Sequence, residues 1–363
     1  MTTHKRIGID ARLLTQTGVG VYTRNLLLEL SKIADPMYSF FIYIRPEDEE
    51  MLPPLPQNST IRYSNARWHS LSEQTLFLYQ LMNDKLDVMH FCYFSMPLFY
   101  SRRFVITIHD VIPYKHTTGT ASTKNSMIYF FKHWVYKKIL INALKKAVRI
   151  FVPTDAVKHD IISLFSFVPQ DKIIRTYEGV DSLLAKAIPA ASKSIPSKPF
   201  FLYVGNYYPH KNVPFLINAF SKSNTNASLV LCGPEDYFSS QIDALIRKTG
   251  STRIERISDT TLDERAYLYS NATALVHPSR DEGFGLPLIE ASYFGCPILA
   301  SDIPVFREIC PDARFFSLDS TTQLIAMLEG SLNISMSHKP QINPQFSFTS
   351  MAKETYNQYK LSL

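Results

Sequence analysis

Residues 281–291 read DEGFGLPLIEA, and their order predicts a strand-to-helix connection. A short apolar run at 274–277 precedes them, which is typical of a buried strand. Gly283 and Gly285 permit a tight loop in which the backbone can approach a ligand. Pro287 suits the first turn of a helix, because its missing N–H would have no partner there. The stretch therefore predicts a strand, a glycine loop and a helix.

The N-terminus of this predicted helix is suited to bind a diphosphate. Its first amides have no partner within the helix and bear a partial positive charge, which attracts anions. Glu282 lies on the loop, and Glu290 lies about one turn into the helix. We expect one carboxylate to contact a sugar and the other a ribose, about the length of a nucleotide sugar apart.

Alternation of strands and helical stretches extends in both directions from this segment. Further apolar runs lie at 6–10, 40–44, 88–91, 104–108, 149–152, 200–204, 228–232 and 297–300. Such alternation predicts parallel sheets built from β-α-β units. A chain of 363 residues also exceeds the roughly 250–300 at which a single core stops growing. We therefore predict an α/β protein with two Rossmann-like, doubly wound domains and a ligand cleft between them.

The division between the domains is predicted from composition. Residues 184–199 read LAKAIPAASKSIPSKP, a proline-rich segment typical of an exposed connection. The predicted domains are 1–184, a linker at 185–199, and a second domain at 200–346. A last helix at 347–363 is expected to pack back on the first domain.

Composition and charge exclude several classes of protein. An apolar content of 45% with 19% charged residues is ordinary for a globular chain and excludes a disordered or fibrous one. No run of about 18 apolar residues is present, and the N-terminus has no signal-peptide pattern. We expect a cytoplasmic protein. The four cysteines form no C-x-x-C pair, so no metal site is expected from them.

A basic segment lies between Lys124 and Arg149. It has seven basic side chains, no acidic one, and aromatic and aliphatic residues between them. A basic amphipathic helix of this kind can bind the anionic inner face of the cytoplasmic membrane. A solvated basic face on a core helix explains the pattern equally well. Nucleic-acid binding is not expected.

Three further segments place glycines or polar residues after predicted strands, where ligands bind in open α/β sheets. They are Gly18, Gly20 and Tyr22 in TGVGVY (17–22), His109 and Asp110 in TIHDVIP (107–113), and Gly205, Asn206 and Lys211 in YVGNYYPHKN (203–212). A lone G-x-G or a lone histidine is weak evidence, because an ordinary turn or a structural histidine explains each.

Taken in order along the chain, these segments resemble the retaining GT-B glycosyltransferases of family 4, the glycosyl transferases group 1. The run from Glu282 to Glu290 is similar to their E-x7-E signature, and Lys211 matches a lysine that binds the donor diphosphate. Many members have an arginine where this chain has Asn206 or His210. Glu178 stands in place of an asparagine in an element resembling Asn-Gly-Val-Asp.

The resemblance implies roles for individual residues. The catalytic set is His109, Glu282 and Lys211. Donor contacts are implied for Gly18, Gly20, Gly205, Asn206, Lys211, Glu282, Gly283, Phe284, Gly285, Leu286 and Glu290. Asp110 and Tyr22 are expected on the acceptor side. Arg280 is a candidate to supply the missing arginine.

The implied function is retaining transfer of a hexose from a nucleotide diphosphate sugar. The segments look most like mannosyltransferases of bacterial surface polysaccharide, including lipopolysaccharide, which favours GDP-mannose as donor and leaves a UDP-hexose as the alternative. The acceptor is expected to be a glycan or a lipid-linked glycan. No cofactor and no metal are expected, since no D-x-D motif is present. A nucleotide-sugar epimerase of the same fold, or a non-catalytic donor-binding partner of a transferase, remains open.

Overall fold

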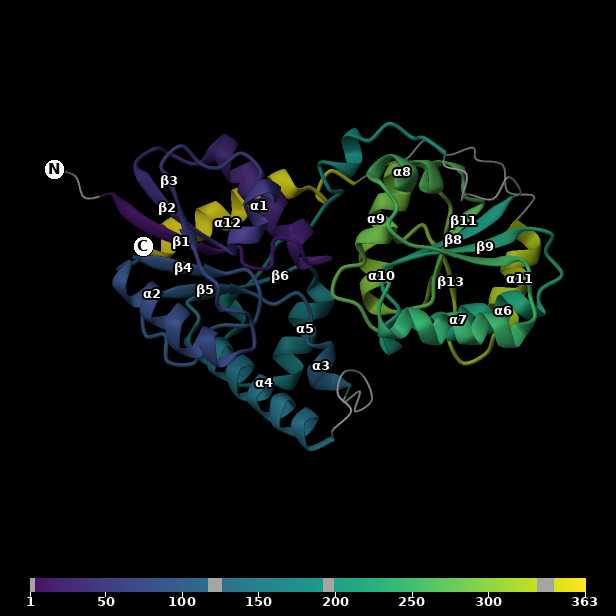
Figure 1. Cartoon of the computed structure of the whole chain (residues 1–363), viewed down its shortest axis with the longest axis horizontal. Helices are drawn as coiled ribbons and strands as arrows, with labels where there is room; N and C mark the ends of the chain where they lie inside the picture. Colours follow the sequence, from purple (N-terminus) through teal and green to yellow (C-terminus); the bar gives the residue numbers. More distant parts are fainter. Residues whose placement is uncertain (1–3, 117–125, 192–198, 332–342) are drawn as a thin grey trace. The chain divides into compact units, whose positions relative to one another are not determined.

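The computed structural model describes residues 4–116, 126–191, 199–331 and 343–363, without the side chains of 126–131. The chain forms two compact units, shown in Figure 1. Unit 1 comprises Met1–Glu178 with Ser347–Leu363, and unit 2 comprises Gly179–Phe346. The division at Glu178 falls slightly before the expected end of the first domain at residue 184.

Unit 1 contains a seven-stranded parallel sheet in the order β3-β2-β1-β4-β5-β6-β7. Its elements are β1 (Lys5–Asp10), α1 (Val19–Ile33), β2 (Tyr38–Ile44), η1 (Pro46–Met51), β3 (Ser59–Tyr63), η2 (Glu73–Phe77), α2 (Leu78–Asn83), β4 (Val88–Phe91), β5 (Phe104–Thr107), α3 (Ile112–Lys115), α4 (Ser126–Lys146), β6 (Arg149–Val152), α5 (Asp155–Leu164), η3 (Gln170–Lys172), β7 (Ile173–Arg175) and α12 (Phe348–Ser362).

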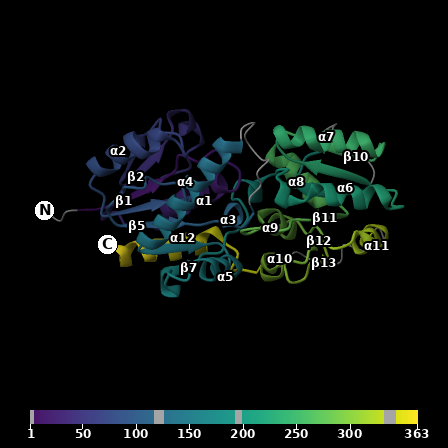
Figure 2. The ribbon, with the colours of Figure 1, turned by 90° about the horizontal axis from the view of Figure 1, so that it is seen from below.

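Helices cover both faces of this sheet. On one face, residues of α2, α4 and α5 share a core with Met89 and Phe91 of β4, and α5 lies against β6 and β7 (Figure 2). On the other face, α1 and α12 lie side by side (Figure 1). The last helix thus packs on the first helix of the chain. The alternate residue of β4, His90, points to this second face, where it hydrogen-bonds Tyr359 of α12.

Unit 2 contains a six-stranded parallel sheet in the order β10-β9-β8-β11-β12-β13. Its elements are η4 (Leu184–Lys186), β8 (Phe200–Val204), η5 (Pro209–Lys211), α6 (Val213–Lys222), β9 (Ser228–Cys232), α7 (Tyr237–Thr249), β10 (Ile254–Ile257), α8 (Leu262–Asn271), β11 (Ala274–His277), α9 (Leu286–Tyr293), β12 (Ile298–Ser301), α10 (Pro304–Ile309), β13 (Arg314–Phe316) and α11 (Thr322–Gly330). Counted along the chain this is the Rossmann order 3-2-1-4-5-6. Figure 1 shows α8, α9 and α10 along one side of the sheet and α6, α7 and α11 along the other.

The expected linker at 185–199 is partly anchored to unit 2. The Ile188 amide donates to Asp263 Oδ1 at 2.9 Å, and the Tyr293 hydroxyl donates to the Ala185 carbonyl at 3.1 Å. Residues 192–198 of the linker lie outside the described residues, as do 332–342 of the second predicted domain. The segment after Gly179 therefore begins as part of unit 2.

The sequence patterns missed four strands, and these are the two edge strands of each sheet: β3, β7, β10 and β13. Each contains exposed or half-buried residues. Edge strands have a partner on one side only, so they do not produce the continuous apolar run of a central parallel strand. The first helix begins directly after Gly18.

Candidate active site

In unit 2, two candidate segments meet at the point where the strand order reverses. Strand β8 lies between β9 and β11, so the connections leaving β8 and β11 run to opposite sides. The loop with Lys211 follows β8, and the loop with Glu282 follows β11. Ligands of open α/β sheets bind in this crevice, beyond the carboxyl ends of the strands.

Lys211 and Glu282 form an ion pair there. The Lys211 ammonium donates to both carboxylate oxygens, at 2.7 and 2.8 Å, and both side chains are largely buried. Burial raises the pKa of Glu282, but the charge of Lys211 together with the smaller effects of His277, His210 and the Lys211 hydrogen bonds lowers that pKa to about 2. Glu282 is therefore an anion at neutral pH, paired with the cation expected to bind the donor phosphates.

Two residues that the sequence patterns did not indicate hold Glu282 in place. Ser279 Oγ donates to Glu282 Oε1 at 2.7 Å, and its oxygen lies 3.1 Å from His277 Nδ1. Burial lowers the pKa of His277 to about 4, so its ring is neutral at pH 7. Since the Ser279 proton goes to Glu282, His277 donates from Nδ1. His277 ends β11 and Ser279 follows it. Polar side chains at the end of an apolar run were the signal in the sequence that could have identified them.

The predicted loop and helix after Glu282 have the expected form. Gly285 has φ of 98°, and a Cβ there would lie 2.9 Å from the Phe306 ring, so glycine is required twice over. It is the N-cap of α9, whose first turn has no side-chain cap and no acidic residue. The backbone N–H of Leu286, the first residue of α9, can therefore bind an anion. Gly283 and Phe284 are buried in this loop.

Glu290 lies on α9, about one turn after the loop. It is buried, and its Oε2 accepts a hydrogen bond of 2.7 Å from the Tyr269 hydroxyl of α8. Burial raises the pKa of Glu290 despite this bond. Tyr269 was not identified from the sequence, because its partner is on a separate helix.

The rest of the first loop of unit 2 is shaped by its backbone. A Cβ on Gly205 would lie 3.0 Å from the Tyr203 hydroxyl, and that hydroxyl donates to the Asn206 carbonyl at 2.5 Å. The Asn206 side chain accepts from the Tyr208 amide at 3.4 Å. Arg280, the candidate replacement for the missing arginine, is exposed and its guanidinium contacts Asn212 Oδ1 at 3.3 Å.

In unit 1, the glycine loop after β1 leads directly into α1. Gly18 is exposed, has φ of 68° and is the N-cap, with no side-chain cap. A Cβ on Gly20 would lie 2.4 Å from the Leu14 carbonyl oxygen, so only glycine fits. Tyr22 in the next turn is buried, and its hydroxyl lies 3.0 Å from Thr107 Oγ1. Its ring packs perpendicular to that of His109, with 4.9 Å between centroids.

His109 follows β5 and is held at both ring nitrogens. Nδ1 lies 3.2 Å from Glu178 Oε1 and Nε2 lies 3.0 Å from the Cys92 carbonyl oxygen. Asp110 beside it accepts a hydrogen bond of 2.9 Å from the Ile112 amide. The structure therefore brings Tyr22 and His109 together within unit 1, as it brings Lys211 and Glu282 together within unit 2.

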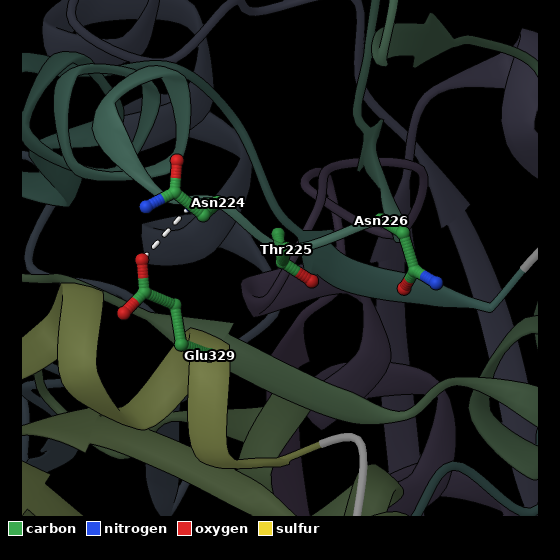
Figure 3. Close-up of a pocket in the computed structure, with 4 residues that line it drawn as sticks. All are labelled: Asn224, Thr225, Asn226 and Glu329. Carbon is green, nitrogen blue, oxygen red and sulfur yellow. Dashed lines mark hydrogen bonds between the residues drawn. The ribbon is translucent and has the colours of Figure 1, made fainter.

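A polar hollow on unit 2 lies away from these residues. It is lined by Asn224, Thr225, Asn226 and Glu329, and the Glu329 carboxylate accepts from the Asn224 amide at 2.9 Å (Figure 3). Residues 224–226 precede β9, so the hollow is at the amino ends of the strands, opposite the candidate loops. Across the described residues, no group of three or more metal-ligating side chains was found.

The basic segment forms much of α4. The predicted starting residue, Lys124, lies outside the described residues. Beyond residue 131 the exposed side chains include Lys132, Trp134, Lys138 and Lys145, and the opposite side of the helix packs into the core through residues such as Leu140 and Leu144. None of the helices in the described part of the chain has the length and apolar character needed to cross a bilayer.

Comparison with known proteins gives a consistent result. The family model of the glycosyl transferases group 1 matches residues 185–319. O-antigen chain mannosyltransferase RfbU of Salmonella typhimurium is 29% identical over 219 residues, which is 59% of this chain and 56% of that protein. O-antigen chain mannosyltransferase B of Escherichia coli is 26% identical over 377 residues, which is 95% of this chain and 96% of that protein.

Solved structures share the fold across the whole chain. Sucrose-phosphate synthase of Thermosynechococcus elongatus is 16% identical with a TM-score of 0.72, and 98% of each chain is covered. WaaG, a glycosyltransferase of lipopolysaccharide biosynthesis, is 15% identical with a TM-score of 0.68 and the same coverage. At these identities the likeness supports the fold alone. Residues 185–319 thus match the glycosyl transferases group 1, and the chain has the two-domain GT-B fold of the glycosyltransferases to which it is similar.

Proposed function

We propose that this protein transfers a mannosyl residue from GDP-mannose to a glycan or lipid-linked acceptor in bacterial surface polysaccharide synthesis, with retention of configuration. The observation that supports transfer most directly is the buried Lys211–Glu282 pair at the strand-order reversal of unit 2. The choice of mannose is supported by two relatives, both O-antigen chain mannosyltransferases.

The proposed reaction requires little covalent chemistry from the protein. An acceptor hydroxyl oxygen attacks the anomeric carbon on the face from which the diphosphate departs. The bond from that carbon to the diphosphate oxygen breaks, the new glycosidic bond forms, and a phosphate oxygen takes the hydroxyl proton. Lys211 and the first amides of α9 would stabilise charge on the leaving diphosphate. Glu282 would hold the sugar and Glu290 the ribose.

The first experiment measures release of nucleoside diphosphate from a panel of GDP-, UDP- and dTDP-sugars. Slow hydrolysis of GDP-mannose by the natural protein is expected, with loss in Lys211→Ala and in Glu282→Ala. Lys222→Ala, at an exposed residue that ends α6, is the matched control and should retain activity. Turnover of a UDP-hexose instead would replace the proposed donor. Conversion of the sugar without release of diphosphate would indicate an epimerase.

We also propose that transfer needs no divalent ion. The leaving diphosphate would be neutralised by Lys211 and by the amides of α9 instead. Activity on the best donor is expected to be unchanged in EDTA. Loss in EDTA that Mg²⁺ or Mn²⁺ restores would contradict this proposal without affecting the assignment as a transferase.

The exposed basic side of α4 is proposed to bind an anionic membrane surface that holds the acceptor. Lys132, Lys138 and Lys145 supply positive charge, and exposed Trp134 suits the interface. Co-sedimentation with vesicles of phosphatidylglycerol and phosphatidylcholine should fall in a Lys132→Glu/Lys138→Glu variant and with rising salt. Binding that is equal on neutral vesicles would contradict an electrostatic contact.

A further inference from the structure

The two contacts of the His109 ring restrict its protonation. Nδ1 faces a carboxylate oxygen of Glu178 at 3.2 Å, and Nε2 faces the carbonyl oxygen of Cys92 at 3.0 Å. A backbone carbonyl only accepts hydrogen bonds, and so does an ionised carboxylate. A neutral imidazole donates from one nitrogen only. A ring that donates to both oxygens therefore has a proton on each nitrogen and a positive charge.

The other groups around His109 are compatible with that charge. Asp110 adds a second carboxylate. The aromatic ring of Tyr22 packs at 4.9 Å between centroids, and an aromatic ring at this distance attracts a cation. Burial lowers the pKa of His90 to about 3, so this neighbour is neutral and does not repel an imidazolium.

Electrostatics at His109 also favour the protonated ring. Burial lowers the pKa of His109, while the hydrogen bond and the negative charge of Glu178, followed by the bond to the Cys92 carbonyl, raise it, and the net pKa is raised above its ordinary value. Glu178 is itself buried, with 4% of its surface exposed. Its charge is therefore poorly screened by water.

We propose that Glu178 is a positioning residue that holds His109 as an imidazolium in one orientation. Unit 1 then presents a fixed cation, not a base, at the carboxyl end of β5. A ring that already has both protons cannot accept the proton of the acceptor hydroxyl, so His109 is not the base of the proposed function, in which the leaving phosphate takes that proton.

The test is NMR titration of histidine side chains labelled with ¹⁵N, without any donor, with His109→Gln to assign the signal. In the natural protein at pH 7, both nitrogens of His109 are expected to be protonated. In Glu178→Gln, burial is no longer offset by the carboxylate, so the pKa of His109 is expected to fall below its ordinary value. Glu178→Asp should restore part of the rise.

The matched control is Glu29→Gln, which alters another buried carboxylate of unit 1 and should leave the His109 titration unchanged. One protonated nitrogen in the natural protein at pH 7 would overturn the proposal, since Glu178 would then be donating its own proton to a neutral ring. An unchanged titration in Glu178→Gln would also overturn it. If Glu178→Gln does not fold, the protonation state of His109 in the natural protein at pH 7 still tests the proposal.

The activity readout is the pH profile of kcat/KM on the donor found to turn over. Glu178→Gln is expected to reduce kcat/KM by about 10- to 100-fold, the range found when the carboxylate behind a metal-bound histidine is lost. The alkaline limb should move to lower pH, which a purely structural role would not produce. Because the titration requires no donor, failure of the transferase proposal and failure of this one are distinguishable.

Discussion

Each unit has a buried ion pair at the carboxyl ends of its strands, and the two pairs differ in what they hold. In unit 2, Lys211 is bound to Glu282, and both residues are expected to contact the donor. In unit 1, His109 is bound to Glu178, which was not among the expected contact residues. The first pair joins two ligand-binding groups to each other, and the second joins one such group to a support.

This difference teaches how each site would respond to a ligand. The Lys211 ammonium must leave Glu282, or share its protons, to bind a phosphate, so donor binding in unit 2 includes exchange of an ion pair. His109 can keep both of its partners, because its charge acts through space. We therefore expect unit 2 to change on binding and His109 to be organised beforehand.

The largest effect is expected at the pair in unit 2. Lys211→Ala should lower kcat/KM by about 10²- to 10³-fold, because an electrostatic group aimed at the leaving group is lost. Steady-state kinetics on the preferred donor measures this. The double variant with Glu282→Gln should lose less than the sum of the two single losses in free energy, because the residues are in contact. Additive losses would indicate that the ion pair is not coupled in function.

The next effect concerns acid stability. The pKa of Glu282 is lowered from 4.5 to about 2, so its contribution is present above pH 4.5 and is lost as the pH falls towards 2. The shift corresponds to about 3 kcal/mol. Hydrogen exchange of β8 and β11 amides between pH 6 and 3 measures it. Glu282→Gln should lack this dependence, and an equal slope in both proteins would exclude Glu282 as its source.

A smaller effect of opposite sign is expected in unit 1. Because the pKa of His109 is raised, its contribution to stability is present below the ordinary value of 6.5 and is lost as the pH rises through the folded value. Exchange of β4 and β5 amides should therefore accelerate on the alkaline side beyond its intrinsic pH dependence. Glu178→Gln should abolish this excess, whereas Glu29→Gln should retain it.

The smallest effect is expected at Glu290, whose carboxyl group accepts a hydrogen bond from the uncharged Tyr269 hydroxyl. Tyr269→Phe removes that donor and should lower the free energy of unfolding of unit 2 by about 1 kcal/mol. Urea unfolding monitored in unit 2 measures the loss. Tyr267→Phe on the same helix is the control and should change stability less. Equal losses would mean that the bond to Glu290 contributes nothing specific.

Central strands and edge strands were not equally predictable. Runs such as 88–91 and 200–204 are buried on both faces, so they are almost entirely apolar, with His90 the exception, and they coincide with β4 and β8. The edge strand β3 has no fully buried residue, and it pairs with β2 on one side only. Its position follows from that pairing, which no local pattern contains.

From the sequence alone follow the two series of central strands, the glycine loop before α9 and the resemblance to the glycosyl transferases group 1. These depend on local composition: apolar runs, glycines that permit positive φ, and a proline at the start of a helix. Only the tertiary structure decided which charges meet. Lys211 and Glu282 are 71 positions apart, and His109 and Glu178 are 69 apart. Such pairs form because parallel strands bring distant loops to one edge of a sheet, where burial strengthens the attraction between opposite charges.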